Sequence, residues 1–112
     1  MIDINEINEL VGSKDFGKAK ELIDIALTEQ ADNIEILKLA GLVSVNLNLW
    51  SDARKYFETV VKFEDTDATS WFYLAKCYEK GEHGLPINLH MASSYYATAI
   101  HEEGREDLIP RA

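Results

Sequence analysis

Apolar residues recur along this chain at spacings of three and four, the period of helices that bury one face. No strands are predicted. Together with its capping residues, the pattern predicts six helices, at 3–12, 15–30, 33–47, 51–64, 68–81 and 89–103. The predicted N-terminal caps are Asp3, in a capping box with Glu6, and Ser51, Asp67 and Asn88, while Gly104 is the predicted stop of the last helix.

The pattern also repeats over a longer distance. When the sequence is compared with itself at an offset of 34, small residues fall on small ones and large residues on large ones. Matched pairs include Ala19 with Ala53, Ile23 with Phe57, Leu37 with Trp71, and Gly41 with Ala75. A small residue is needed where two helices approach closely, and a large one where a gap must be filled. Each unit is therefore predicted to be a helical hairpin that stacks on its neighbours.

The outer units depart from the regular spacing. In the first unit the core positions Ile4, Ile7 and Val11 match best if one residue is missing from its turn. In the third unit the second helix is displaced by five residues, so that the offset becomes 39. The only place for these residues is the segment 81–88, whose two glycines and proline predict a loop between the helices.

The period and the residues that carry it resemble the tetratricopeptide repeat, whose first helix has the pattern W-x-x-L-G-x-x-Y. The third unit has Trp71, Leu74, Ala75 and Tyr78 at these positions, while the middle unit has Ser44 in place of the aromatic residue. The loop at 81–88 is similar to that of the Sel-like variant. The resemblance implies an all-α fold, a right-handed α-α superhelix of three hairpins. It places repeats at about 1–32, 33–66 and 67–103 in one domain, 1–103, followed by a tail at 104–112.

Composition and charge narrow the class of partner. Twenty acidic residues against eleven basic ones give a net charge of -9, which would repel a nucleic-acid backbone. Only one cysteine is present, Cys77, and the N-terminus lacks the basic start and apolar run of a secretory signal. No stretch is apolar for the roughly 18 residues that cross a bilayer. We therefore expect a cytoplasmic protein that binds no nucleic acid and does not insert into membranes.

The residues that usually carry catalysis are sparse and scattered. Cys77, His83 and His90 have neither the C-x-x-C nor the i,i+4 spacing of a dependable metal site, and His101 stands alone. A buried thiol without a basic neighbour is unreactive, which favours a packing role for Cys77. We therefore expect no enzymatic activity, cofactor or metal.

The resemblance implies that the first helices of the three repeats line a concave groove. The groove positions that it implies are Glu35, Lys38, Leu42, Val45 and Asn46 in the middle repeat, Thr69, Phe72, Lys76, Glu79 and Lys80 in the third, and Asn5 and Glu9 in the first. From these we select as candidate partner-binding residues Lys38, Leu42, Val45, Asn46, Phe72, Lys76 and Lys80. Leu42, Val45 and Phe72 would be apolar anchors, and the three lysines would suit a ligand carboxylate. The alternative is ordinary packing between repeats and solvated lysines.

One well-known groove of this family clamps the terminal carboxylate of chaperone tails. Leu39 and Tyr73 stand where that clamp has an asparagine and an arginine, so chaperone tails are not predicted ligands.

Three functions remain open from the sequence. The first is an adaptor that holds a peptide or helix of a partner protein in its groove. The second is the repeat segment of a larger enzyme, for example a glycosyltransferase, that positions a protein substrate. The third is a homodimerisation module, because the apolar middle helix and the end of the array have more apolar surface than three repeats need.

Overall fold

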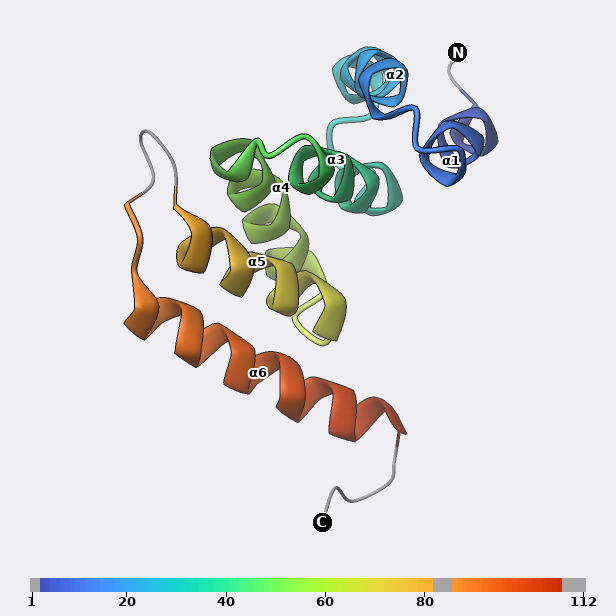
Figure 1. The fold of residues 1–112 in the computed structure, drawn as a ribbon. Helices are drawn as coiled ribbons and strands as arrows, with labels where there is room; N and C mark the ends of the chain where they lie inside the picture. The colour runs from blue at the N-terminus through green and yellow to red at the C-terminus, as the bar shows by residue number, and fades with distance from the viewer. Residues whose placement is uncertain (1–2, 82–85, 108–112) are drawn as a thin grey trace.

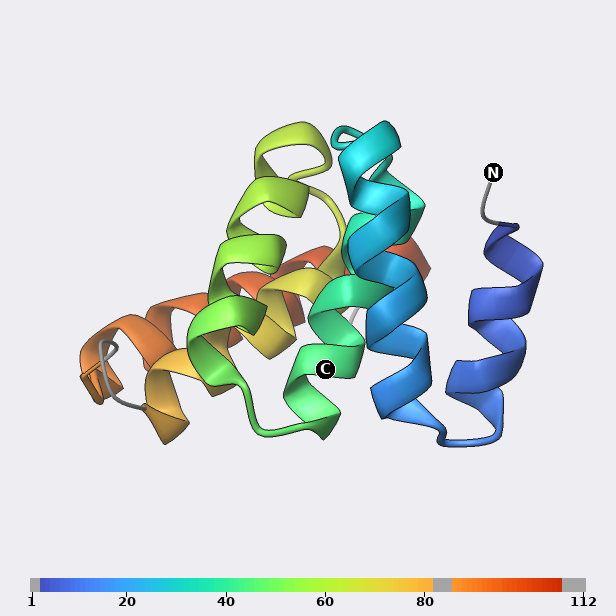
Figure 2. The ribbon, with the colours of Figure 1, turned by 90° about the horizontal axis from the view of Figure 1, so that it is seen from above.

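The computed structural model describes residues 3–81 and 86–107, and the side chains of all of these except 104–107. Over these residues the chain is all-helical. The helices are α1 (Ile4–Gly12), α2 (Phe16–Glu29), α3 (Ile34–Asn46), α4 (Trp50–Phe63), α5 (Ala68–Lys80) and α6 (Leu89–Asp107). Each helix packs on the next, and α1 also approaches α3 (Figures 1 and 2). The predicted all-α class is thus confirmed.

The repeat period found in the sequence governs where the helices begin and end. α2 and α4 have the same bounds when shifted by 34, and so do α3 and α5. The turns repeat as well: the amide of Asp15 donates to the carbonyl of Leu10 at 2.8 Å, and that of Leu49 donates to the carbonyl of Ser44 at 2.8 Å. Sequence repetition therefore corresponds to repetition of backbone conformation.

The first turn corrects one prediction. Lys14 and Asn48, which are one repeat period apart, both adopt positive φ, at 65° and 61°. Since the ends of α1 and α3, at Gly12 and Asn46, are separated by the same period, no residue is missing from the first turn. The core residues of α1 suggested a deletion because this short helix buries only Ile7 completely. A single buried position fixes the register poorly.

Two predicted helix ends are also wrong. α4 begins at Trp50 with Leu49 as its cap, so Ser51 lies inside the first turn instead of before it. The tight preceding turn sets this start, as it does for α2 after Asp15. α6 continues through Gly104 to Asp107. A single glycine costs a helix only about 1 kcal/mol, which does not by itself end it.

The other predicted caps precede their helices. Asp3 precedes α1 and accepts a hydrogen bond from the amide of Asn5 at 3.0 Å. Asn88 accepts one from the amide of Met91 at 3.0 Å and so caps α6. Asp67 precedes α5 but makes no side-chain bond to the helix backbone. Its carboxylate is engaged elsewhere, as described below.

The core forms two clusters that meet between α3 and α4. The first is built on α1, α2 and α3, and its buried residues are Ile7, Ala19, Ile23, Ala26, Ile36, Ala40 and Val43. The second is built on α4 and α5, with Ala53, Phe57, Leu74 and Cys77 buried and Tyr95 of α6 packed against them. The positions matched by the repeat are buried or half-buried. Ile100, which the offset of 39 matches with Val61, is the exception, because it remains 65% exposed on α6.

Candidate interaction groove

Three neighbouring hollows lie along the first helices of the hairpins. The hollow between α1 and α3, of about 230 Å³, shares Lys38 and Leu39 with the hollow of about 260 Å³ between α3 and α5. The latter shares Thr69 and Tyr73 with a third, of about 600 Å³, between α5 and α6. We call the first two together the inner groove and the third the α5–α6 hollow. The shared residues make the three hollows one continuous surface.

The hollow between α3 and α5 is lined mainly by apolar side chains. Leu39 and Leu42 come from α3, Phe57 from α4, and Tyr73 from α5. The rings of Phe57 and Tyr73 stack with centroids 5.4 Å apart, so core packing holds the floor of the hollow in place. Thr69 and the buried Ser70 add hydroxyl groups. Such a surface suits an apolar side chain flanked by hydrogen-bonding groups.

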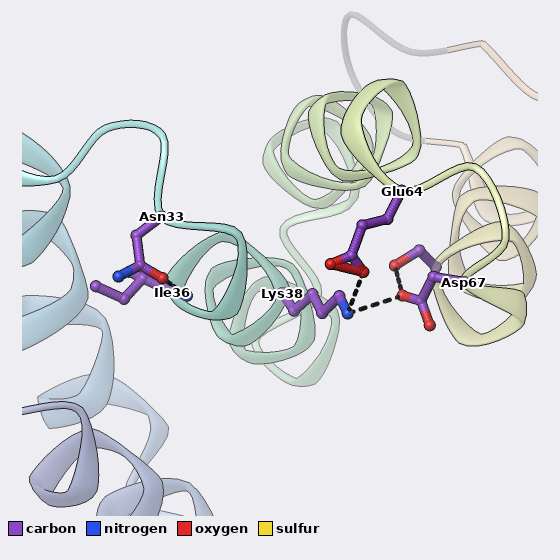
Figure 3. A network of polar contacts seen from close by, with 6 residues as sticks. Asn33, Ile36, Lys38, Glu64 and Asp67 are labelled. Atoms are coloured by element: carbon purple, nitrogen blue, oxygen red, sulfur yellow. Dashed lines mark hydrogen bonds and ion pairs between the residues drawn. The ribbon is translucent and has the colours of Figure 1, made fainter.

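A polar network borders this hollow (Figure 3). The ammonium of Lys38 lies 2.9 Å from Oε2 of Glu64 and 3.7 Å from Oδ2 of Asp67. Partial burial lowers the pKa of Lys38, but the hydrogen bond to Glu64 and the charge of Asp67 outweigh it, so that the pKa is raised. Asp67 also accepts a hydrogen bond from the hydroxyl of Ser70. One positive charge therefore faces two negative ones.

Asn33 and Asp67 show how the third unit departs from the second. They occupy equivalent positions of the repeat, and each precedes the first helix of its hairpin. Asn33 caps α3 through a bond from the amide of Ile36 at 3.2 Å, as Figure 3 shows. Ser70 takes the place of Ile36 in the third unit, and Asp67 turns to Ser70 and Lys38 instead. The cap position has thereby become part of the groove wall.

The α5–α6 hollow is aromatic. Phe72, which is 40% exposed, contacts Tyr73 and Tyr96 edge-on at centroid distances of 5.4 and 5.6 Å. The ammonium of Lys76 lies 5.6 Å from the centroid of the Phe72 ring, within cation-π range. The hydroxyl of Tyr96 donates to Oε1 of Glu79 at 2.6 Å. Burial and this hydrogen bond raise the pKa of Tyr96 well above its usual range.

The candidate residues chosen from the sequence separate into three groups. Lys38 and Leu42 line the inner groove, and Phe72 lines the α5–α6 hollow. Val45 packs against the second core cluster, and Asn46 donates to the carbonyl of Leu42 in its own helix at 2.9 Å. The remaining two are lysines of α5: Lys76 is held over Phe72, and Lys80 is exposed at the end of the helix.

Several lining residues were not among the candidates. Leu39 and Tyr73 occupy equivalent positions of the repeat and both face the hollow between α3 and α5, so the period itself is the signal that pairs them. In the first hairpin, Ile4 and Asn8 line the groove. The register with a missing residue had pointed instead to Asn5 and Glu9. Asp67 could not be found from sequence, because its role depends on Lys38, 29 positions earlier.

The residues able to do chemistry do not converge. Within the described residues, no group of three or more His, Cys, Asp and Glu side chains is placed to hold a metal ion. Cys77 is fully buried, and His90 and His101 are exposed on α6. His83 and Gly84 of the predicted loop lie outside the described residues. Among the helices described, none is long and apolar enough to cross a membrane.

The chain matches no protein-family model, no curated protein and no solved structure.

Proposed function

We propose that this chain is a tetratricopeptide-like interaction module that binds a segment of another protein in its inner groove. The observation that carries the proposal is the apolar hollow between α3 and α5, with Leu39, Leu42 and Tyr73 around it. A preformed hollow of about 260 Å³ suits one large apolar side chain of a ligand. The periodic repetition of helix bounds and turns supports the repeat class. We further propose that the hairpins follow the superhelical path of that class.

The charges around the groove favour a neutral or basic segment. Lys38 is already matched by Glu64 and Asp67, so a ligand carboxylate would have to displace one of them. Glu35 lines the adjoining hollow, and the chain as a whole carries a net charge of -9. A lysine or arginine next to the apolar anchor would therefore be attracted to Asp67 and Glu64. Lys76 and Lys80 lie further along α5 and leave this part of the groove acidic.

The proposal is tested by capturing partners from the source cells with the full chain and with Leu42→Asp. Leu42 is half-buried at the hollow, so a carboxylate there would add an unpaired charge where the ligand's apolar side chain docks. The matched control is Phe63→Asp, because Phe63 is 60% exposed on α4 and lines none of the three hollows. We expect Leu42→Asp to lose partners that Phe63→Asp retains.

Circular dichroism and thermal melting of both variants show whether the fold persists. Recovery of the same partners by a folded Leu42→Asp variant would contradict the groove assignment. Exchange of Asp67 for Asn, with Asn33 present as the natural precedent for this cap, then tests the preference for a basic segment. If the partners bind the parent chain and the Asp67→Asn variant equally well at low salt, the charge of the groove does not select them.

A further inference from the structure

Between Pro86 and His101, the exposed side of α6 has no charged side chains other than histidine. This stretch contains no Asp, Glu, Lys or Arg, although such residues make up 28% of the chain. α6 packs on α5 and lies at the edge of the molecule, as Figure 1 shows. Its exposed side, which we call the outer face, borders the α5–α6 hollow at Ile100, and Leu89 and Ile100 are each 65% accessible. A helix face exposed to water normally carries charge, and an uncharged one indicates contact with another surface.

Four residues along one edge of this face form a regular stripe. Leu89, Ser93, Tyr96 and Ile100 follow one another at spacings of four, three and four, the spacing of a seam between two packed helices. Leu89, Ser93 and Ile100 are exposed, and Tyr96 is half-buried with its hydroxyl held by Glu79. The order of spacings is the same from either end. The stripe can therefore pair with its own copy in the antiparallel direction.

Antiparallel pairing also matches the sizes of the side chains. Leu89 would face Ile100 of the second copy, and the small Ser93 would face the large Tyr96 of the second copy. Each match occurs twice because of the two-fold axis. Alternation of small and large residues lets two helices interlock closely. A parallel arrangement would place Tyr96 against Tyr96 of the second copy and lose this fit.

The exposed apolar residues at the two ends of this stretch complement each other as well. Ile87, 62% exposed, and Leu89 lie at its N-terminal end. Ile100 lies eleven residues on, about 16 Å along the helix, beside Phe72 and the α5–α6 hollow. An antiparallel second copy would bring its Ile87 and Leu89 to this hollow. The hollow of about 600 Å³ has room for such side chains.

Charge favours a second copy on this face over a basic partner. Two chains with a net charge of -9 repel each other wherever acidic residues meet. They approach at the least cost through the face that carries none. Two carboxylates border the stripe, those of Glu79, which Tyr96 engages, and Glu103, and neither lies between Pro86 and His101.

We propose that the chain forms a two-fold dimer through the outer face of α6, in which Leu89 of one copy packs against Ile100 of the other. The stripe contributes no residue to the two hollows of the inner groove. The proposal therefore does not depend on what the groove binds.

Sedimentation equilibrium of the full chain, from about 10 μM to about 1 mM, tests the dimer. We expect the mass to rise from that of the monomer toward twice that value. Leu89→Lys and Ile100→Glu should each weaken the dimer at least about tenfold, because each buries an unpaired charge opposite an apolar residue. The matched control is Phe63→Glu, which adds the same charge at a similarly exposed residue of α4 and should leave the dimer unchanged.

The double variant Leu89→Lys with Ile100→Glu tests the direction of pairing. In the antiparallel dimer each lysine meets a glutamate of the second copy, so association should recover most of what either single variant loses. A monomer mass throughout the concentration range would overturn the proposal and leave the face to a different protein. So would a dimer that neither single variant weakens, or a double variant weaker than both single variants.

Discussion

At the scale of single residues, Gly41 shows how closely the helices of one hairpin approach. A methyl group built on Gly41 would lie 2.6 Å from two carbon atoms of the Phe57 ring. Phe57 is buried, and it is held on another side by stacking on Tyr73. The ring therefore has little freedom to move away. The sequence repeat predicts a small residue at this position, because the equivalent residue of the next unit is Ala75.

Gly41→Ala is expected to lower the free energy of unfolding by about 1–2 kcal/mol. Overpacking a core costs about 1–3 kcal/mol, and the gain of a better helix former returns up to about 1 kcal/mol. Gly17→Ala is the control, because a methyl group there meets nothing within 4 Å. It should leave stability unchanged or raise it slightly. Urea denaturation measures both, and similar shifts in the two variants would contradict the close contact.

Sequence could predict which residues share a face, but not all of their partners. The small residue at Gly41 follows from the repeat period, whereas Leu42 was chosen from the groove positions that the resemblance implies. Tyr73 was not chosen, although the period pairs it with Leu39. Lys38 lines the hollow between α3 and α5, yet its bonds to Glu64 and Asp67 were not predictable. Those carboxylates are 26 and 29 positions away and reach Lys38 only because α3 packs beside the turn that leads into α5.

At the scale of helices, α6 is joined to α5 by aromatic contacts and one short hydrogen bond. Tyr96 donates to Glu79 at 2.6 Å, and its ring contacts Phe72. Folding raises the pKa of Tyr96, first through burial and then through Glu79. The folded chain thus holds this proton more tightly than the unfolded chain does. The resulting stabilisation is complete below the ordinary tyrosine pKa of about 10 and is lost as the pH rises above it.

Tyr96→Phe is expected to make stability less dependent on pH in the alkaline range. The variant should be less stable than the parent at pH 7, by about 1 kcal/mol for the lost hydrogen bond. Above pH of about 10 the difference should narrow, because phenylalanine has no proton to lose. Folding raises the pKa values of Tyr56 and Tyr95 too, through burial, so a part of the dependence should remain. Parallel curves for the two proteins, from denaturation at several pH values, would contradict this role.

The bounds of the helices were predictable where the period and a polar cap agreed. Asn88 and Asp3 mark helix starts through bonds from their side chains. The start of α4 was missed because Leu49 caps it without a side-chain acceptor, so the turn geometry alone decides it. The end of α6 was missed because a glycine permits a stop without enforcing one.

At the scale of the whole molecule, the core is divided into two clusters and the surface is acidic. One cluster spans α1 to α3 and the other α4 to α6, and α3 and α4 pack together where they meet. The net charge of -9 acts across this assembly and favours expansion. The ion pairs on the surface, such as Lys20 with Asp24 at 2.9 Å, oppose it only locally.

Added salt is therefore expected to stabilise the fold. Screening weakens repulsion among the excess carboxylates more than it weakens a few exposed ion pairs, each worth at most about 1 kcal/mol. Between about 10 mM and about 500 mM sodium chloride, the melting temperature should rise by on the order of 5 °C. Sodium perchlorate at equal ionic strength separates screening from salting-out. A melting temperature that falls with both salts would show that local ion pairs outweigh the repulsion.

The two turns that match across one repeat period also bear on how such a chain can grow. The backbone enters and leaves the segment from Asp15 to Asn48 in the same conformation, with the bond from Asp15 to Leu10 reproduced by that from Leu49 to Ser44. An in-frame duplication of the codons for this segment would join Asn48 to a second Asp15. That junction needs no turn that the protein does not already form. A single duplication can thus add one helical hairpin to the array. The new hairpin would join at a turn where hairpins already pack on one another.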